Sequence, residues 1–154
     1  MMREYRKTID RIDQLYRSLG GDKTPDEYLL SIIASHICIL QSGILENIVK
    51  ETLGEYCDKR CTAEVANFVK RRLKDLQNPR TDKLEDLLGS FSESWRKDLV
   101  AFWVDGETRG HINSIVTNRN QIAHGRTTTV TISQTKDWLR SIKRFADYIE
   151  QTFH

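Results

Sequence analysis

Hydrophobic residues recur every three or four positions over most of this 154-residue chain. Such spacing places them on one face of an α-helix. The first such segment carries Ile9, Ile12, Leu15, Tyr16 and Leu19. The last carries Trp138, Ile142, Phe145, Ile149 and Phe153. With similar segments between them, the pattern predicts an all-α fold, a bundle of about five or six helices.

Capping and turn residues divide this pattern into elements. In "TPDE", Thr24 is predicted to cap a long second helix that reaches about Cys57. A break near Gly89 is expected to separate two shorter helices, and Ser133 is predicted to cap the last one. Between the last two helices, "RTTTVTI" is rich in β-branched residues, which predicts a short extended segment near 127–132.

The stretch 28–45, "YLLSIIASHICILQSGIL", has no formal charge and approaches the length of a membrane span. It also contains polar residues, including Gln41, and continues into the charged "ENIVKE". We interpret it as the central core helix, buried on most sides, with His36 as a hydrogen-bonded core histidine. No membrane association is expected.

Composition narrows the function classes only modestly. Hydrophobic residues make up 38% and charged residues 30% of the chain, as in a soluble globular protein. The net charge of +2 permits a polyanionic partner without indicating one. Three cysteines, an odd count, and a charged first segment without an apolar signal core suggest a reducing cytoplasm.

Few residues suggest a metal or cofactor site. Cys57 and Cys61 are four apart and would share a helix face, but ordinary packing is favoured because no zinc-like partners accompany them. The chain has no glycine-rich phosphate loop, HExxH motif or serine-hydrolase elbow. We therefore expect neither a metal nor a cofactor.

A basic cluster lies in the middle of the chain, with a further cation, Arg126, later on. The cluster consists of Lys70, Arg71, Arg72 and Lys74. These five side chains are candidate RNA-binding residues, since such a run can follow a phosphate backbone. More often, such a run is a solvated helix face.

The most informative stretch is "VTNRNQIAHGRTTT", residues 116–129. Arg119 lies about two turns beyond Ile112, on the face expected to meet the core, where a guanidinium is costly unless an anion meets it. Asn120 and His124 are four apart and neighbours on one stripe. Gly125 is predicted to end the helix. These groups could surround a small anion.

This stretch resembles the Arg-x(4–6)-His motif of HEPN domains, an all-α family with many ribonuclease members. The segment after the motif, "TTTVTISQTKDWLRSIKRFADYIEQTF", is similar to that of the RiboL-PSP-type subgroup, and the long early helix also fits. The resemblance covers most of residues 28–153. It implies that Arg119 and His124 match the catalytic pair, Asn120 the polar position between them, and Glu46, more loosely, a supporting acid that would compensate Arg119.

The resemblance implies one HEPN-like domain over residues 1–154 and a metal-independent endoribonuclease acting on RNA as a homodimer, in a toxin or antiviral-defence role. An antitoxin or regulatory protein is then an expected partner. The alternative is a non-catalytic HEPN-type module for dimerisation or nucleotide and RNA binding, with Arg119 and Glu46 as a buried ion pair. A plain helical scaffold leaves the core-facing Arg119 unexplained.

Overall fold

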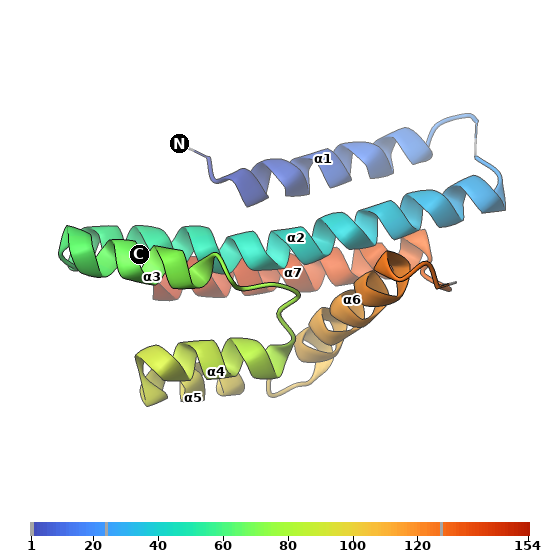
Figure 1. Ribbon diagram of the computed structural model, residues 1–154. Helices are drawn as coiled ribbons and strands as arrows, with labels where there is room; N and C mark the ends of the chain where they lie inside the picture. The colour runs from blue at the N-terminus through green and yellow to red at the C-terminus, as the bar shows by residue number, and fades with distance from the viewer. Residues whose placement is uncertain (1, 24, 127) are drawn as a thin grey trace.

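The computed structural model describes residues 2–23, 25–126 and 128–154. Over these ranges the fold is all-helical, with seven helices and no strand, which confirms the all-α prediction (Figure 1). The helices are α1 (Glu4–Leu19), α2 (Glu27–Arg60), α3 (Ala63–Leu73), α4 (Thr81–Phe91), α5 (Glu93–Phe102), α6 (Glu107–Ala123) and α7 (Ile132–Thr152). The count exceeds the predicted five or six.

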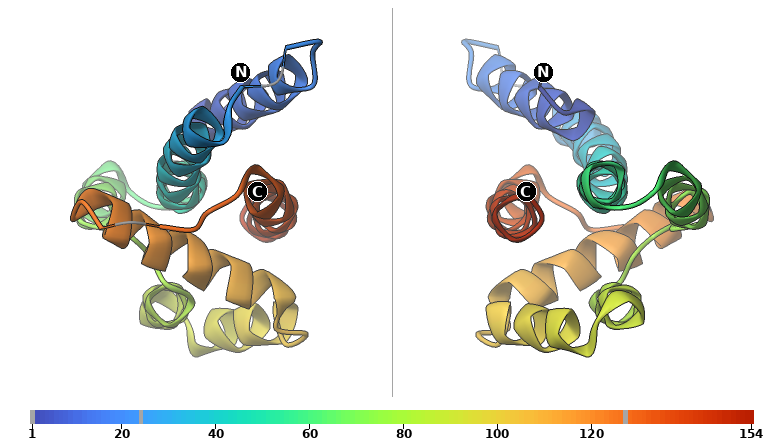
Figure 2. Two further views of the ribbon diagram at one scale, coloured as in Figure 1. Left: turned by 90° about the vertical axis from the view of Figure 1, so that its right-hand side faces the viewer. Right: turned by 90° about the vertical axis from the view of Figure 1, so that its left-hand side faces the viewer.

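The helices surround a central pair formed by α2 and α7 (Figure 1). α1 lies along one side of this pair, and the α4–α5 hairpin lies on the opposite side (Figures 1 and 2). α6 packs against both α2 and α7, while α3 folds back along the C-terminal half of α2. The C-terminal end of α6 therefore lies at the end of the molecule where α2 begins.

Several predicted boundaries are wrong by a few residues. α2 is capped by Asp26, whose side chain accepts the Leu29 N–H at 2.8 Å, while the predicted cap Thr24 lies outside the described residues. α7 is capped by Thr131 rather than Ser133, in a capping box with Gln134. Both true caps have extended backbone conformations, which a cap residue needs.

Two further boundaries differ from the sequence pattern. α2 continues to Arg60 instead of ending near Cys57. The break between α4 and α5 falls at Ser92, whose backbone is extended (φ −162°, ψ 131°), and Gly89 remains inside α4. Of the expected extended segment near 127–132, residue 127 lies outside the described residues, residues 128–131 form neither helix nor strand, and Ile132 is already helical.

α2 is buried differently along its length. Most of its buried residues lie from Ile37 onward, including Ile44, Leu45 and Ile48. Its first half exposes an apolar stripe made of Tyr28, Leu29, Ile32 and Ile39. The expectation that this helix is buried on most sides is therefore wrong for its first half, since neighbouring helices cover only one side there.

Polar contacts fasten α1 to the end of α7. The Glu150 carboxylate accepts hydrogen bonds from Tyr5 and Arg6 and also pairs with Arg3 at 3.0 Å. Partial burial acts to raise the pKa of Glu150, but the hydrogen bonds from Arg6 and Tyr5 outweigh it and lower that pKa to about 2. The ionised carboxylate is thus favoured by the fold.

This contact predicts acid sensitivity. A glutamate in the unfolded chain has a pKa of about 4.3, so the stability contributed by Glu150 is present above that value and is lost as the pH falls toward about 2. We expect Glu150→Gln to lower the free energy of unfolding near neutral pH, and the difference from wild type to shrink between about pH 5 and pH 2. Urea denaturation at several pH values measures this, and a difference independent of pH would contradict it.

Candidate functional site

α6 carries the candidate site at its C-terminal end. The helix buries one side against the core through Thr108, Ile112, Ile115 and Val116. A hydrogen bond from the Cys38 thiol to the Ile115 carbonyl, with an Sγ–O distance of 3.5 Å, places this part of α6 against the first half of α2. The candidate residues follow directly after this buried segment.

The polar side chains in the first three turns of α6 are used to fix the helix. Arg109 pairs with the nearly buried Glu85 of α4. The Nδ1 atom of His111 lies 2.7 Å from the Ser141 hydroxyl of α7. Asn113 exchanges hydrogen bonds with the Thr81 side chain, and its amide oxygen also accepts the Thr81 N–H. These contacts hold α6 against α4 and α7.

The segment that leads into α4 adds a further anchor. Arg80 donates a hydrogen bond to the Thr117 hydroxyl at 2.7 Å. Two residues earlier, the N–H of Asn78 is bound by the Glu46 carboxylate of α2 at 2.9 Å. The segment thus connects α2 to α6, one turn before the candidate residues.

The last turns of α6 are different. Arg119 and Asn120 are half-buried and His124 is exposed. Within the described ranges, none of these three side chains makes a hydrogen bond or an ion pair. Arg119 follows the buried residues Ile112, Ile115 and Val116 on the same side of the helix and is half-buried.

The helix end is shaped by Gly125. Gly125 has a positive φ of 69°, its N–H bonds the Ile122 carbonyl, and the Arg126 N–H bonds the Gln121 carbonyl. This pair of bonds is the Schellman termination, which requires a left-handed residue and favours glycine. His124 is therefore held at the C-cap of α6, directly before the turn.

Glu46 does not compensate Arg119, which corrects the prediction. In the part of the chain that the structure describes, its carboxylate contacts the Asn78 N–H and, at 3.7 Å, the Lys50 ammonium. The reason is geometric: the segment between α3 and α4 crosses α2 at this point and presents an unbonded N–H. Asn78 has a positive φ of 48°, so this turn is strained and gains from a strong acceptor.

Comparison with protein families gives one finding. The family model described as RiboL-PSP-HEPN matches residues 3–154. The chain belongs to the RiboL-PSP-HEPN family. HEPN domains are generally associated with ribonuclease activity, and they commonly dimerise and bind RNA. No curated protein and no solved structure matches the chain.

Of the remaining candidates of this HEPN chain, the basic cluster lies apart from the α6 end and Arg126 lies beside it. The basic cluster is on α3, on the C-terminal half of α2, whereas α6 ends near the start of α2 (Figure 1). Lys70 is paired with Asp58 at 2.8 Å, and Arg71, Arg72 and Lys74 are exposed. Arg126 is exposed and close to His124 in sequence, so it is the one candidate cation beside the α6 end.

Two other histidines of the HEPN chain have surroundings that were not predicted from the sequence. His36 is exposed rather than buried in the core, because it lies on the uncovered side of the first half of α2. His111 contacts Ser141 and is a structural residue. One indication of this contact is present in the sequence: His111 directly precedes the buried Ile112, so its side chain lies at the edge of the buried face of α6.

The three cysteines are free thiols. Cys38 and Cys57 are buried and Cys61 is exposed. Burial raises the pKa of the Cys38 thiol to about 12, so this thiol is not a nucleophile near neutral pH. Across residues 2–23, 25–126 and 128–154, no group of three or more His, Cys, Asp or Glu side chains is placed to hold a metal ion.

The length and composition of α2 would allow it to cross a membrane. It nevertheless packs against α1, α3, α6 and α7. The core helix of a soluble protein passes the same test of length and apolarity. In α2, 39% of the most apolar 18-residue stretch is buried.

The contact of Glu46 predicts a structural effect of its substitution. Glu46→Ala should lower the free energy of unfolding by about 1–2 kcal/mol, because the Asn78 N–H loses its charged acceptor. Glu46→Gln keeps an oxygen in the same place and should remain closer to wild type. Chemical denaturation measures both variants. Equal losses of stability in Glu46→Ala and Glu46→Gln would show that the negative charge of Glu46, and not the position of its oxygen, is what stabilises the fold.

Proposed function

We propose that residues 1–154 act as one HEPN domain with metal-independent endoribonuclease activity. One observation carries the proposal. The polar side chains in the first turns of α6 are bonded to other helices, whereas Arg119, Asn120 and His124 have no bonding partner among the described residues. A helix that leaves three such groups together at its end has them available for a ligand.

These side chains suit cleavage of RNA by its own 2′-hydroxyl. A histidine can take the proton from this hydroxyl or give one to the leaving 5′-oxygen, since its ordinary pKa is near neutrality. The Arg119 guanidinium matches the phosphate oxygens and stabilises the charge of the phosphorane. Asn120 offers a further hydrogen-bond donor to the phosphate.

One copy of the site is incomplete. The attacking and leaving oxygens lie on opposite sides of phosphorus, so one His124 cannot serve both. A two-fold dimer brings a second Arg119 and His124 to the same phosphate. We therefore place the active site at a homodimer interface.

The first half of α2 supports this interface. Its apolar stripe is exposed, with exposed fractions of 77% for Tyr28, 45% for Leu29, 47% for Ile32 and 42% for Ile39. An apolar stripe of this kind is typical of a contact surface for another chain. It lies at the same end of the molecule as the end of α6, so pairing of two stripes would bring two α6 ends close together (Figure 1).

In a cell, such an activity requires restraint. We propose a toxin or antiviral-defence effector in the cytoplasm, controlled by an antitoxin or another regulatory protein. The three unpaired cysteines are compatible with a reducing compartment. Lys70, Arg71, Arg72, Lys74 and Arg126 remain candidate RNA contacts.

A second function is a non-catalytic HEPN module that dimerises or binds RNA. The environment of His124 favours this second function. His124 is exposed, and among the described residues of one chain no carboxylate or carbonyl binds its imidazole. A catalytic base is normally oriented by such a partner. The second protomer or the RNA could supply it.

The nuclease proposal predicts loss of cleavage in His124→Ala, by about 100-fold or more, as expected when a general acid–base is removed. RNA cleavage is measured with excess chelator, and the wild-type products should end in 2′,3′-cyclic phosphates. His154→Ala, an exposed histidine near the C-terminus, is the matched control and should cleave like wild type. Equal cleavage by His124→Ala would contradict the assignment, and no cleavage by any form would favour the binding module.

The interface proposal predicts that Ile32→Glu weakens dimerisation by about thirtyfold or more, because a charge enters the centre of the apolar stripe. Light scattering after size-exclusion chromatography measures the mass in solution, and cleavage should fall along with it. Val104→Glu is the control, since Val104 is 81% exposed and lies after α5, away from the stripe. A dimer that survives Ile32→Glu would place the interface elsewhere.

A further inference from the structure

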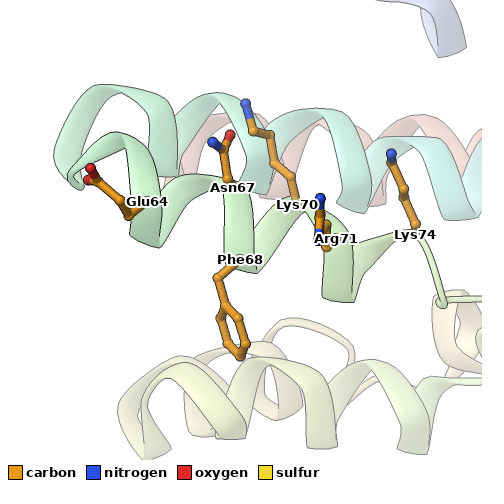
Figure 3. A pocket seen from close by; sticks show the side chains of 6 residues that line it. All are labelled: Glu64, Asn67, Phe68, Lys70, Arg71 and Lys74. Atoms are coloured by element: carbon orange, nitrogen blue, oxygen red, sulfur yellow. The ribbon is translucent and has the colours of Figure 1, made fainter.

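The outer face of α3 combines an exposed aromatic ring with cations. Phe68 has 59% of its surface exposed, and the Arg72 guanidinium lies 5.3 Å from the centre of its ring. Asn67, Lys70, Arg71 and Lys74 project from neighbouring positions of the same helix (Figure 3). Together with Phe68 and Glu64 they line an open pocket of about 710 Å³.

A second, apolar groove adjoins this pocket. It has a volume of about 390 Å³, runs between α3 and α4, and is lined largely by apolar side chains. Phe68 lines both hollows, and in Figure 3 its ring points toward α4 while Lys70 and Lys74 point away from α4. A second aromatic ring, Phe91 of α4, lines the same groove and is 37% exposed.

Cations predominate on this face, and Glu64 is the one carboxylate among the residues that line the pocket. Residues 67–74, "NFVKRRLK", hold four cations and no acid. Lys70 has an ion-pair partner in Asp58, while Arg71, Arg72 and Lys74 form none with other described residues. Cations in the last turn of a helix are favourable in themselves, but that effect explains neither the exposed ring beside them nor the two adjoining hollows.

We propose that this α3 face, defined by Phe68, Lys70, Arg71 and Lys74, is a binding site for single-stranded RNA. The backbone phosphates follow the cations, and an unstacked base lies against the Phe68 ring at the mouth of the apolar groove. Proteins bind single-stranded nucleic acid by this combination of a basic track and an aromatic platform. The proposal rests on the proposed function only in taking RNA as the ligand, because binding at α3 needs no cleavage.

The alternative occupant is an acidic amphipathic peptide, which would place apolar side chains in the groove and carboxylates on the cations. RNA is favoured for two reasons. The pocket lined by cations is larger than the apolar groove, and aromatic rings from both α3 and α4 line that groove. Since α3 and the C-terminal end of α6 lie at different ends of the molecule, one RNA must run along the protein to reach both (Figure 1). The α3 face therefore serves substrate capture.

Fluorescence anisotropy tests the aromatic part of the proposal. The probe is a labelled, unstructured RNA of mixed sequence, about 20 nucleotides long, and all proteins carry His124→Ala to prevent cleavage. Phe68→Ala should weaken binding by about tenfold, the usual effect of losing one base-stacking ring. Phe68→Tyr should bind like the parent protein. Phe68→Leu, which stays apolar, should resemble Phe68→Ala.

The salt dependence of the same binding tests the phosphate contacts. Each neutralised phosphate contributes about 0.7 to the slope of log K against log salt for a single strand. Arg71→Gln with Lys74→Gln should therefore reduce the slope by about 1.4. Arg11→Gln with Arg17→Gln, two exposed arginines of α1, removes the same charge and should leave the slope nearly unchanged.

The outcomes separate this inference from the nuclease proposal. RNA binding that is unaffected by the Phe68 and Arg71/Lys74 variants overturns the α3 site, whatever His124 does. A synthetic Leu/Glu amphipathic peptide that binds in a Phe68-dependent way, while RNA binding is independent of Phe68, overturns it in favour of a protein partner. RNA binding lost in the α3 variants supports the site even if the wild-type protein cleaves no RNA.

Discussion

The position of α6 depends on polar contacts that fix its first three turns against α4 and α7. Asn113 and Thr81 exchange hydrogen bonds, and Arg109 pairs with Glu85, a carboxylate that also accepts the Trp103 indole N–H at 3.0 Å. Each hydrogen bond contributes only about 1 kcal/mol, but an unbonded Glu85 would be costly because it is nearly buried. The direction of the α6 end follows from this anchoring.

Beyond Thr117, the side chains of Arg119, Asn120 and His124 make no hydrogen bond or ion pair with other described residues, although Ile122 still packs against the core. An arginine that is half-buried without an anionic partner is less stable than a paired one, so this end of the molecule is not optimised for folding alone. The exposed apolar stripe on the first half of α2 is a second feature of the same kind and lies at the same end. A second protomer and a phosphate together would satisfy both features.

The presence and approximate lengths of the helices could be predicted from the sequence, because hydrophobic periodicity and turn residues are local signals. Gly125 was predictable as a helix stop, since a left-handed C′ position favours glycine in almost any context. The caps were less predictable. "TPDE" and "TISQ" each offer more than one capping residue, and the choice of Asp26 and Thr131 depends on where the chain arrives from the preceding segment.

The sequence by itself determined the all-α class, the family and the placement of Arg119, Asn120 and His124 in the last turns of one helix, because each is a matter of spacing along the chain. Tertiary structure decided which groups meet. Glu46 binds the Asn78 N–H because a distant segment crosses α2 there, and that crossing has no local signal. The same holds for exposure: the apolar first half of α2 is uncovered because its neighbours pack on one side only, and burial depends on the packing of all helices together.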